Sequence, residues 1–380
     1  MKFYIIAGEA SGDLHGSNLI KELKKQDPSS VIRCWGGDLM QNAGGDLVKH
    51  YRDLAFMGFI EVAKNLIIIL RNLRFCKQDI QLFQPDAIIL IDYPGFNLRI
   101  AKWAKQQKIK VIYYISPQVW AWKESRVKLI KDCVDKMLVI LPFEKEFYKK
   151  WNFEVEYVGH PLIEVVESYK QQAMGNRQWA TGNGQWAMGN GQNQDIIALL
   201  PGSRKQEISK KLPVMLELSK FFPNHQFIIA EAPSLDHSFY ETFTADHSNV
   251  SSLANKTYQL LLTAKAALVT SGTATLETAL FEVPEVVCYK ASPVSYYIAR
   301  RLIQVKYISL VNLIMDKEVV KELIQGELNV ENLKRELSQI LTNETRIAEI
   351  KKDYADLKKI LSEGSTASSK AAASILRFLK

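Results

Sequence analysis

The chain has 380 residues, of which 47% are hydrophobic, and its formal net charge is +8. This length and composition exclude a disordered or fibrous chain, and they predict a globular protein with two domains rather than one oversized core. The charge predicts an anionic partner: nucleic acid, a phosphorylated substrate or an acidic membrane surface. Nucleic acid is the least favoured, because the lysines and arginines are dispersed and no RNA-binding signature is present.

The four cysteines, Cys34, Cys76, Cys133 and Cys288, lie far apart without metal-type spacing. We expect buried thiols in a reducing compartment, with no disulfide and no metal site. The N-terminal apolar stretch is too short for a secretory signal and is followed at once by Glu9. The sequence therefore predicts a cytoplasmic protein.

Short apolar runs alternate with helical stretches along the chain, which predicts parallel β-α-β units. In the first half the expected strands are 3–7, 31–35, 87–91, 111–115 and 137–141. The alternation begins again after residue 194, with expected strands at 196–200, 226–230, 266–270 and 286–289. Two similar α/β halves are the expected result.

Two polar turns follow strands of the first half. Residues 7–13 come after the first strand, and Glu9, Ser11 and Gly12 are candidates for lining a cleft. This turn resembles half of a dinucleotide fingerprint, but the full glycine spacing is absent, so an NAD site is weakly supported. Asp92 follows the strand 87–91 at a carboxyl end, where ligands of parallel sheets bind, and could serve as a general base. An aspartate that merely forms the Pro-Gly turn is the alternative.

The segment 56–75 has more apolar residues than one helix face needs. Met57, Ile68 and Ile69 fall outside the expected core stripe and lie beside cations such as Arg71. This pattern predicts a helix on an anionic membrane surface, with a fully buried helix as the competing interpretation. The expected core stripe comprises Phe56, Phe59, Ile60, Ala63, Leu66, Ile67, Leu70 and Leu73.

A seven-residue repeat rich in glycine and asparagine occupies residues 175–192, between the halves. Gly and Asn in every unit disfavour a helix, and one Trp and one Ala per unit cannot bury a core. We expect a flexible inserted linker. A role of Trp179 and Trp186 in gripping a lipid or a partner is the less favoured alternative.

Two glycine turns in the second half, 200–204 and 270–277, each follow an expected strand and open a helix. Small residues let backbone N–H groups approach an anion closely, and a helix N-terminus favours phosphate. Arg204 adds a planar cation, and Glu277 offers a carboxylate that can accept from both hydroxyls of a ribose. Each turn alone is also an ordinary strand-to-helix connection. Together they predict a site for a nucleoside diphosphate.

Taken together, these segments resemble the lipid-A-disaccharide synthases, bacterial glycosyltransferases of the GT-B type. The resemblance covers nearly the whole chain outside the repeats. It differs at Gly95, where the family often has an acid, so Asp92 must act without a second carboxylate in that loop. The residues that carry the resemblance are 7–13, 57–62, 91–97, 116–122, 141–144, 200–204, 271–277 and 309–313.

The resemblance implies an α/β fold of two Rossmann-like domains that face each other across a cleft, with the C-terminal helix packing back on the N-terminal domain. The expected ranges are 1–170 for an acceptor- and lipid-binding domain, 171–194 for the repeat linker, 195–345 for a UDP-sugar-binding domain and 346–380 for the returning helices.

The resemblance also implies the reaction. An inverting, metal-independent transfer without a cofactor would move 2,3-diacylglucosamine from UDP to the 6-hydroxyl of 2,3-diacylglucosamine 1-phosphate, with Asp92 removing the acceptor proton. The protein would lie peripherally on the anionic cytoplasmic surface of the inner membrane, and a homodimer is left open. A UDP-sugar 2-epimerase of the same architecture is the alternative. The implied UDP-sugar contacts are Gly202, Ser203, Arg204, Ser271, Gly272, Thr273, Ala274, Glu277 and Asn312.

Overall fold

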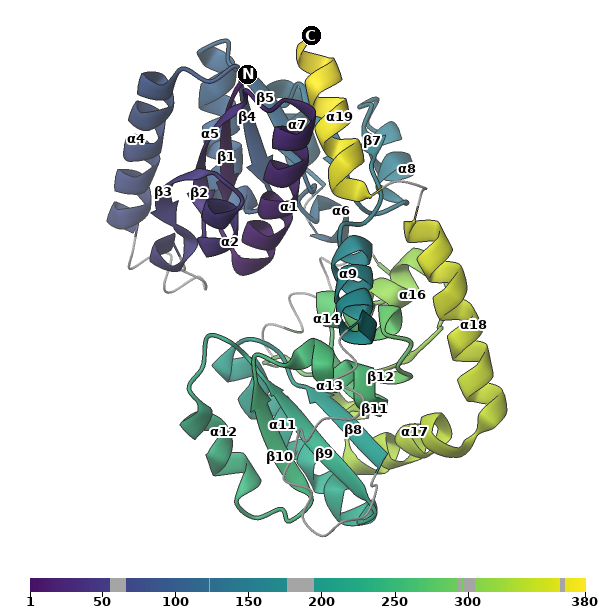
Figure 1. Ribbon diagram of the computed structural model, residues 1–380. Coiled ribbons are helices and arrows are strands. Elements are labelled where there is room, and N and C mark those ends of the chain that lie inside the picture. Colours follow the sequence, from purple (N-terminus) through teal and green to yellow (C-terminus); the bar gives the residue numbers. More distant parts are fainter. Residues whose placement is uncertain (55–65, 123, 176–194, 293–295, 297–304, 363–365) are drawn as a thin grey trace. The chain divides into compact units, whose positions relative to one another are not determined.

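The structure is a computed structural model that describes residues 1–54, 66–122, 124–175, 195–292, 296, 305–362 and 366–380. The chain divides into two units, the first made of Met1–Pro161 with Leu361–Lys380 and the second of Leu162–Ile360. Each unit consists of a parallel sheet with helices packed on it (Figure 1). The α/β class with two Rossmann-like units is confirmed.

The first unit is built on a seven-stranded sheet in the order β3-β2-β1-β4-β5-β6-β7. From β1 the chain adds β2 and β3 on one side and then β4 to β7 on the other, so the strand order reverses between β1 and β4. These two strands pair directly, with Ala7 opposite Ile91. Ligands of such sheets bind at the carboxyl ends of the strands beside this reversal. The strands are β1 (Lys2–Ala7), β2 (Val31–Gly36), β3 (Asp46–His50), β4 (Ala87–Ile91), β5 (Lys110–Tyr114), β6 (Lys136–Val139) and β7 (Glu156–Tyr157).

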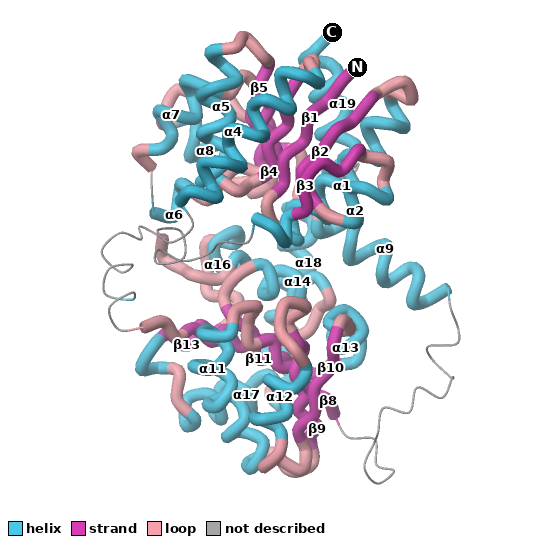
Figure 2. The backbone as a smooth tube through the Cα atoms, turned by 90° about the vertical axis from the view of Figure 1, so that its left-hand side faces the viewer, coloured by secondary structure: helices cyan, strands magenta, loops and turns pink. Residues whose placement is uncertain are grey.

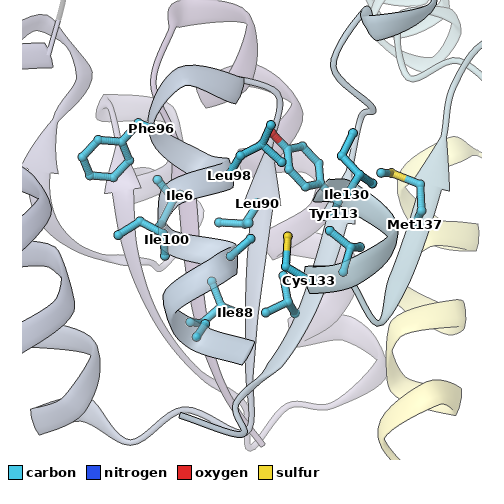
Figure 3. Close-up of a cluster of buried hydrophobic side chains, with 14 of the residues drawn as sticks. Ile6, Ile88, Leu90, Phe96, Leu98, Ile100, Tyr113, Ile130, Cys133 and Met137 are labelled. Carbon is cyan, nitrogen blue, oxygen red and sulfur yellow. The ribbon is translucent and has the colours of Figure 1, made fainter. Parts of the chain in front are cut away.

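Helices cover both faces of this sheet. Buried side chains of β4, β5 and β6 pack against α5 and α7, as Figure 3 shows for Leu90, Tyr113 and Met137. The helix α1 lies on the opposite face from α4 and α5 (Figures 1 and 2). The helices of this part are α1 (Ala10–Gln26), α2 (Asp38–Asn42), η1 (Tyr51–Leu54), α4 (Leu66–Phe83), α5 (Pro94–Gln106), α6 (Val119–Trp122), α7 (Arg126–Cys133) and α8 (Glu144–Lys149).

The last helix, α19 (Ala367–Leu379), belongs to the first unit although it is the end of the chain. It packs along α1, and its Ser369 carbonyl accepts from Gln26 at 3.1 Å. Ser374 donates to Glu156, the first residue of the edge strand β7, at 2.6 Å. The small residues Ala371 and Ala372 are fully buried, which allows this close packing. The expected return of the C-terminal helix to the N-terminal sheet is therefore confirmed.

The second unit has a six-stranded parallel sheet in the order β10-β9-β8-β11-β12-β13, which reverses between β8 and β11. The strands are β8 (Asp195–Leu200), β9 (His225–Glu231), β10 (Val250–Ala254), β11 (Ala264–Thr270), β12 (Glu285–Tyr289) and β13 (Lys321–Ile324). The helices are α9 (Leu162–Gly175), α11 (Lys205–Glu217), η2 (Leu218–Phe221), α12 (His237–Thr244), α13 (Thr257–Thr263), α14 (Thr273–Leu280), α16 (Leu310–Met315), η3 (Gln325–Glu327), α17 (Val330–Thr342) and α18 (Glu344–Leu361).

The units differ from the expected ranges at two points. Helix α9 belongs to the second unit, where Lys170 donates to the Leu280 carbonyl at 2.8 Å and Tyr169 contacts Phe281. Nearly all of α18 also belongs to the second unit, so of the two C-terminal helices α19 alone joins the first. Apart from Gly175, the repeats at 175–192 lie outside the described residues.

All nine expected strands are present, and the strands that the sequence did not reveal lie toward the sheet edges. β3 and β10 each lie at one edge of their sheets, and neither has a buried residue. A strand without a buried face has no apolar alternation to reveal it. All four cysteines are buried free thiols, as expected.

Candidate functional site

A pocket of about 310 Å³ lies at the carboxyl end of the second sheet. Its wall is formed where β8, β9 and β11 end and by the turns that follow, so it sits at the reversal between β8 and β11. Both glycine turns that the sequence singled out contribute to it, through Gly202, Ser203 and residues 271–274. The fold therefore brings together two turns that are about 70 residues apart in the chain.

The first turn depends on Gly202. Its φ of +118° lies in a region that residues with a side chain rarely adopt. A Cβ there would also approach Glu207 Oε2 to 3.1 Å and the Lys211 Nζ to 3.5 Å. Gly202 thus lets the backbone pass close over the first turns of α11. The neighbouring Ser203 accepts a hydrogen bond from Ser234 at its carbonyl, at 3.2 Å.

The second turn begins α14. Its N-cap residue, Gly272, has a φ of +138°, while open space surrounds the position of a Cβ, so the backbone conformation alone demands glycine. The first N–H groups of a helix lack partners within the helix and favour an anion. The Ser271 hydroxyl donates to the Ile308 carbonyl at 2.7 Å, which ties the turn to the segment before α16. The residues Thr273 and Ala274 also line the pocket.

Glu277 lines the same pocket one turn into α14. Tyr258 of α13 donates to its Oε1 at 2.9 Å, and burial raises the pKa of this carboxyl. Tyr258 in turn packs against Tyr169 of α9 and Phe281, with ring centroids 5.3 and 5.1 Å apart. The carboxylate is thereby fixed in one orientation, as a residue that recognises a ligand hydroxyl requires.

Arg204 is the N-cap of α11, and it is not among the residues that line the pocket. Its guanidinium lies 3.4 Å from Glu207 Oε1, with the Arg204 side chain 61% exposed. Exposed ion pairs of this kind contribute about 0–1 kcal/mol. The pair is thus weak enough for the guanidinium to exchange Glu207 for a phosphate.

Asn312, one of the expected UDP contacts, is not among the residues that line the pocket. Asn312 on α16 is fully buried, and its amide nitrogen donates to the Val320 carbonyl and to Glu322 Oε1 at 2.8 and 2.9 Å. Its oxygen accepts from the backbone N–H groups of Val319 and Val320 at 2.8 and 3.0 Å. These four bonds use the whole capacity of the amide. Asn312 therefore ties α16 to β13 and to the two residues before it, and its side-chain amide has no hydrogen-bonding capacity left for UDP; the UDP contact stays a prediction.

Two charged residues of this region escaped the sequence analysis. Lys211 of α11 is almost fully buried and donates to Thr270, the last residue of β11; burial lowers the pKa of this ammonium. It lies on the apolar stripe with Ile208 and Leu212, and a lysine inside such a stripe was the available signal. Glu231 ends β9 and lines the pocket, where it raises the pKa of His237 by accepting from Nδ1 at 2.7 Å.

In the first unit, the reversal between β1 and β4 carries the turns that the sequence singled out. Asp92 and Tyr93 directly follow β4 and both have positive φ, +43° and +48°. Such a conformation is costly for a bulky residue and marks functional sites. The Asp92 carbonyl accepts from Asn97 at 2.8 Å and from Tyr113 at 2.5 Å, which stabilises this conformation.

The Asp92 carboxyl has the properties of a base that works near neutral pH. Burial, and next the negative charge of Glu9, raise its pKa from 3.8 to about 7. A general base is most effective when its pKa is close to the working pH. The position that sequence reasoning chose for a base is thus also the place where the environment tunes a carboxyl.

Glu9 is the N-cap of α1 in the turn after β1. In the first turn of α1, Ser11 is exposed and Gly12 is buried, where a Cβ would meet that of Ala7 at 3.0 Å. Gly8 has even less space for a side chain than Gly12, because a Cβ there would lie 2.4 Å from the Tyr93 ring. Glu9 thus lies near Asp92, and the glycines allow the turns after β1 and β4 to pack together.

Comparison with known proteins adds the family. The family model described as lipid-A-disaccharide synthetase matches residues 3–377. The chain belongs to this family. A lipid-A-disaccharide synthase of Syntrophus aciditrophicus is 42% identical over 360 residues, covering 93% of this chain and 92% of the relative. One of Legionella pneumophila, strain Philadelphia 1, is 36% identical over 364 residues, covering 94% and 92%.

Solved structures similar to this member of the lipid-A-disaccharide synthetase family share its fold at low sequence identity. The UDP-GlcNAc 2-epimerase of Neisseria meningitidis, bound to UDP-GlcNAc, aligns with a TM-score of 0.67 at 14% identity, over 100% of this chain and 99% of that one. The glycotransferase of kitacinnamycin aligns with a TM-score of 0.65 at 11% identity, over 100% and 99%. These likenesses establish the two-unit architecture.

The α4 helix of this family member turns a different face outward than expected. Leu73, Cys76 and Ile80 are buried, and Ile69, one turn earlier, packs on the same cluster. Ile67 and Leu70, assigned to the core stripe, are instead 80% and 57% exposed.

The reason is the helical repeat: the stripe fixed by Leu73 and Ile80 runs back through Ile69 rather than Leu70. Ile69 is thus partly covered by the core cluster and Ile68 is half-buried, so lipid contact at these two residues stays a prediction. Arg71 is exposed, as expected, and Met57 lies outside the described residues. No helix in the described part of the chain combines the length and apolar character needed to cross a bilayer.

Proposed function

We propose that this protein condenses UDP-2,3-diacylglucosamine with 2,3-diacylglucosamine 1-phosphate to give a lipid A disaccharide 1-phosphate and UDP. The observation that carries this proposal is the pocket of the second unit, where two glycine turns meet at the sheet reversal in a chain of this family. Relatives named lipid-A-disaccharide synthase align with this chain over nearly their whole length.

We place the UDP-sugar in the pocket of the second unit. The turns at Gly202 and Gly272 bind the diphosphate through backbone N–H groups and the two helix N-termini. Glu277, held by Tyr258, accepts from the ribose hydroxyls. Arg204 leaves its weak pair with Glu207 and contacts the departing diphosphate, whose growing negative charge it stabilises.

Asp92 is the proposed base. Its carboxylate takes the proton of the acceptor 6-hydroxyl as that oxygen forms its bond to C1 of the donor sugar. The bond from C1 to the diphosphate oxygen breaks with it, so the configuration at C1 inverts and UDP leaves with the electron pair. A pKa of about 7 allows Asp92 to hold this proton and then release it to water.

Acylated substrates are recruited at a membrane in the proposal, through the outer face of α4. This face combines Ile67 and Leu70 with the exposed cations Arg71 and Arg74. Apolar side chains flanked by cations suit the surface of an anionic bilayer. We expect Ile67→Ser with Leu70→Ser to reduce binding to phosphatidylglycerol vesicles in a sedimentation assay. Leu82→Ser on the same helix, where the leucine is 83% exposed, is the control; equal effects would refute a specific face.

The reaction is tested by incubating the purified protein with both acylated sugars in the presence of a chelator and analysing the products by mass spectrometry. Formation of the disaccharide 1-phosphate and UDP is the expected result. A parallel incubation with UDP-GlcNAc tests the epimerase alternative, and a 2-epimer formed without any disaccharide would overturn the proposal.

Two variants separate the proposed roles. Asp92→Ala should abolish turnover but leave UDP affinity nearly unchanged, because the base acts on the acceptor. Arg204→Ala should weaken UDP binding and the rate together, by about 2 kcal/mol for a charge-assisted contact. An active Asp92→Ala enzyme, or an Arg204→Ala enzyme with normal UDP affinity, would contradict the assignment.

A further inference from the structure

Lys211 is a buried cation that has no role in the proposed reaction. Its side chain is 3% exposed and lies on the buried face of α11, together with Ile208 and Leu212. A buried ammonium is costly unless charges or hydrogen bonds compensate it. Its presence directly behind the wall of this site therefore calls for a reason beyond packing.

The groups around the Lys211 ammonium compensate its positive charge only in part. Among the described residues, Thr270 is its hydrogen-bond acceptor, and the nearest carboxylate oxygen is Glu207 Oε2 at 3.9 Å. That carboxylate is 40% exposed and is shared with Arg204, whose Nη1 lies 3.4 Å from the other oxygen. One glutamate thus faces two cations, Lys211 and Arg204.

The ammonium also lies between the two glycine turns. A Cβ on Gly202 would stand 3.5 Å from its Nζ, so the backbone of the first turn passes directly over it. Its partner Thr270 is the last residue of β11 and the first residue of the second turn. Gly202, Thr270 and Glu207 all line the pocket, so the charge lies just behind the wall where both turns meet.

We propose that Lys211 is a positioning residue of the nucleotide site, which joins the two turns and supplies a fixed positive charge behind the bound diphosphate. This inference rests on the proposed function of the pocket as a UDP-sugar site. A buried cation is poorly screened by salt and needs no rearrangement when the ligand arrives, unlike the exposed Arg204.

The test compares Lys211→Met with Lys210→Met, which removes the same charge from an exposed position one residue away on α11. Methionine nearly matches lysine in length and suits a buried position, so we expect Lys211→Met to fold with an unchanged or higher thermal midpoint. The full-length protein is titrated with UDP by calorimetry, and with uridine by saturation-transfer NMR because nucleoside binding is weak.

We expect Lys211→Met to weaken UDP binding about tenfold, as for loss of a nearby charge in a partly screened site, and to leave uridine binding unchanged. Lys210→Met should change neither. Equal losses for UDP and uridine would show a merely structural role and overturn the inference, as would unchanged UDP affinity or an equal effect in Lys210→Met. If the unaltered protein fails to bind UDP, the proposed function fails instead.

Discussion

The pH dependence of the reaction gives the sharpest test of Asp92. Its pKa rises from 3.8 to about 7, which corresponds to about 4 kcal/mol in favour of the neutral carboxyl at 1.36 kcal/mol per pH unit. A base must be ionised to accept a proton, so kcat/KM should rise with pH, with a midpoint near 7.

The perturbation is Glu9→Gln, which removes the second cause of this rise and leaves the first, burial, in place. A neighbouring like charge changes a pKa by on the order of one unit. The ionised fraction of Asp92 at pH 6 would then grow from roughly one tenth to one half, which predicts about a fivefold higher kcat/KM. At pH 8, where Asp92 is already ionised, the gain should be less than about a tenth.

The assay is the initial rate of disaccharide formation at low substrate, measured from pH 5 to 9 for the unaltered protein and for Glu9→Gln. A midpoint below pH 5 in the unaltered protein would refute the role of Asp92 as the base. A loss of rate in Glu9→Gln that is the same at every pH would refute the electrostatic role of Glu9 and indicate direct participation in the reaction.

Three further predictions concern stability in denaturant or heat. Gly272→Ala should lower the free energy of unfolding by about 1–3 kcal/mol, because Gly272 has a positive φ. Gly95→Ala, inside α5, should leave this free energy unchanged or raise it by up to about 1 kcal/mol. Equal effects of the two substitutions would disprove that the positive φ is the cause. Burial raises the pKa of Glu285 well above 4.5, so stability is lost as pH rises beyond that value. Glu285→Gln should therefore gain thermal midpoint over the unaltered protein between pH 5 and 8, and a constant difference across this range would contradict the assignment. Gly8→Ala should cost about 1–3 kcal/mol through its clash with the Tyr93 ring, and clearly less in a Tyr93→Ala background; a cost that is the same in both backgrounds would show that the ring is not the cause.

The sequence alone was enough for the α/β class, the central strands and both glycine turns. The reason is that these features are local. A buried parallel strand is a continuous apolar run, and a turn that opens a helix with Gly-Ser or Ser-Gly can be recognised from a few residues. Asp92 was found in the same way, because it directly follows the fully buried strand β4.

Other features depend on contacts between distant parts of the chain. The reversal between β8 and β11 brings the two turns into one pocket, and a pKa near 7 at Asp92 requires burial and Glu9 together. The outer face of α4 follows from how that helix docks on the sheet, which a surplus of apolar residues does not specify. Side-chain partners also matter: the amide of Asn312 is saturated by Val319, Val320 and Glu322. Lys211 is linked to the second glycine turn through its bond to Thr270. The sequence thus determined the elements and their chemistry, and the tertiary structure decided which residues share a site, because burial and hydrogen bonding exist only once the chain has packed.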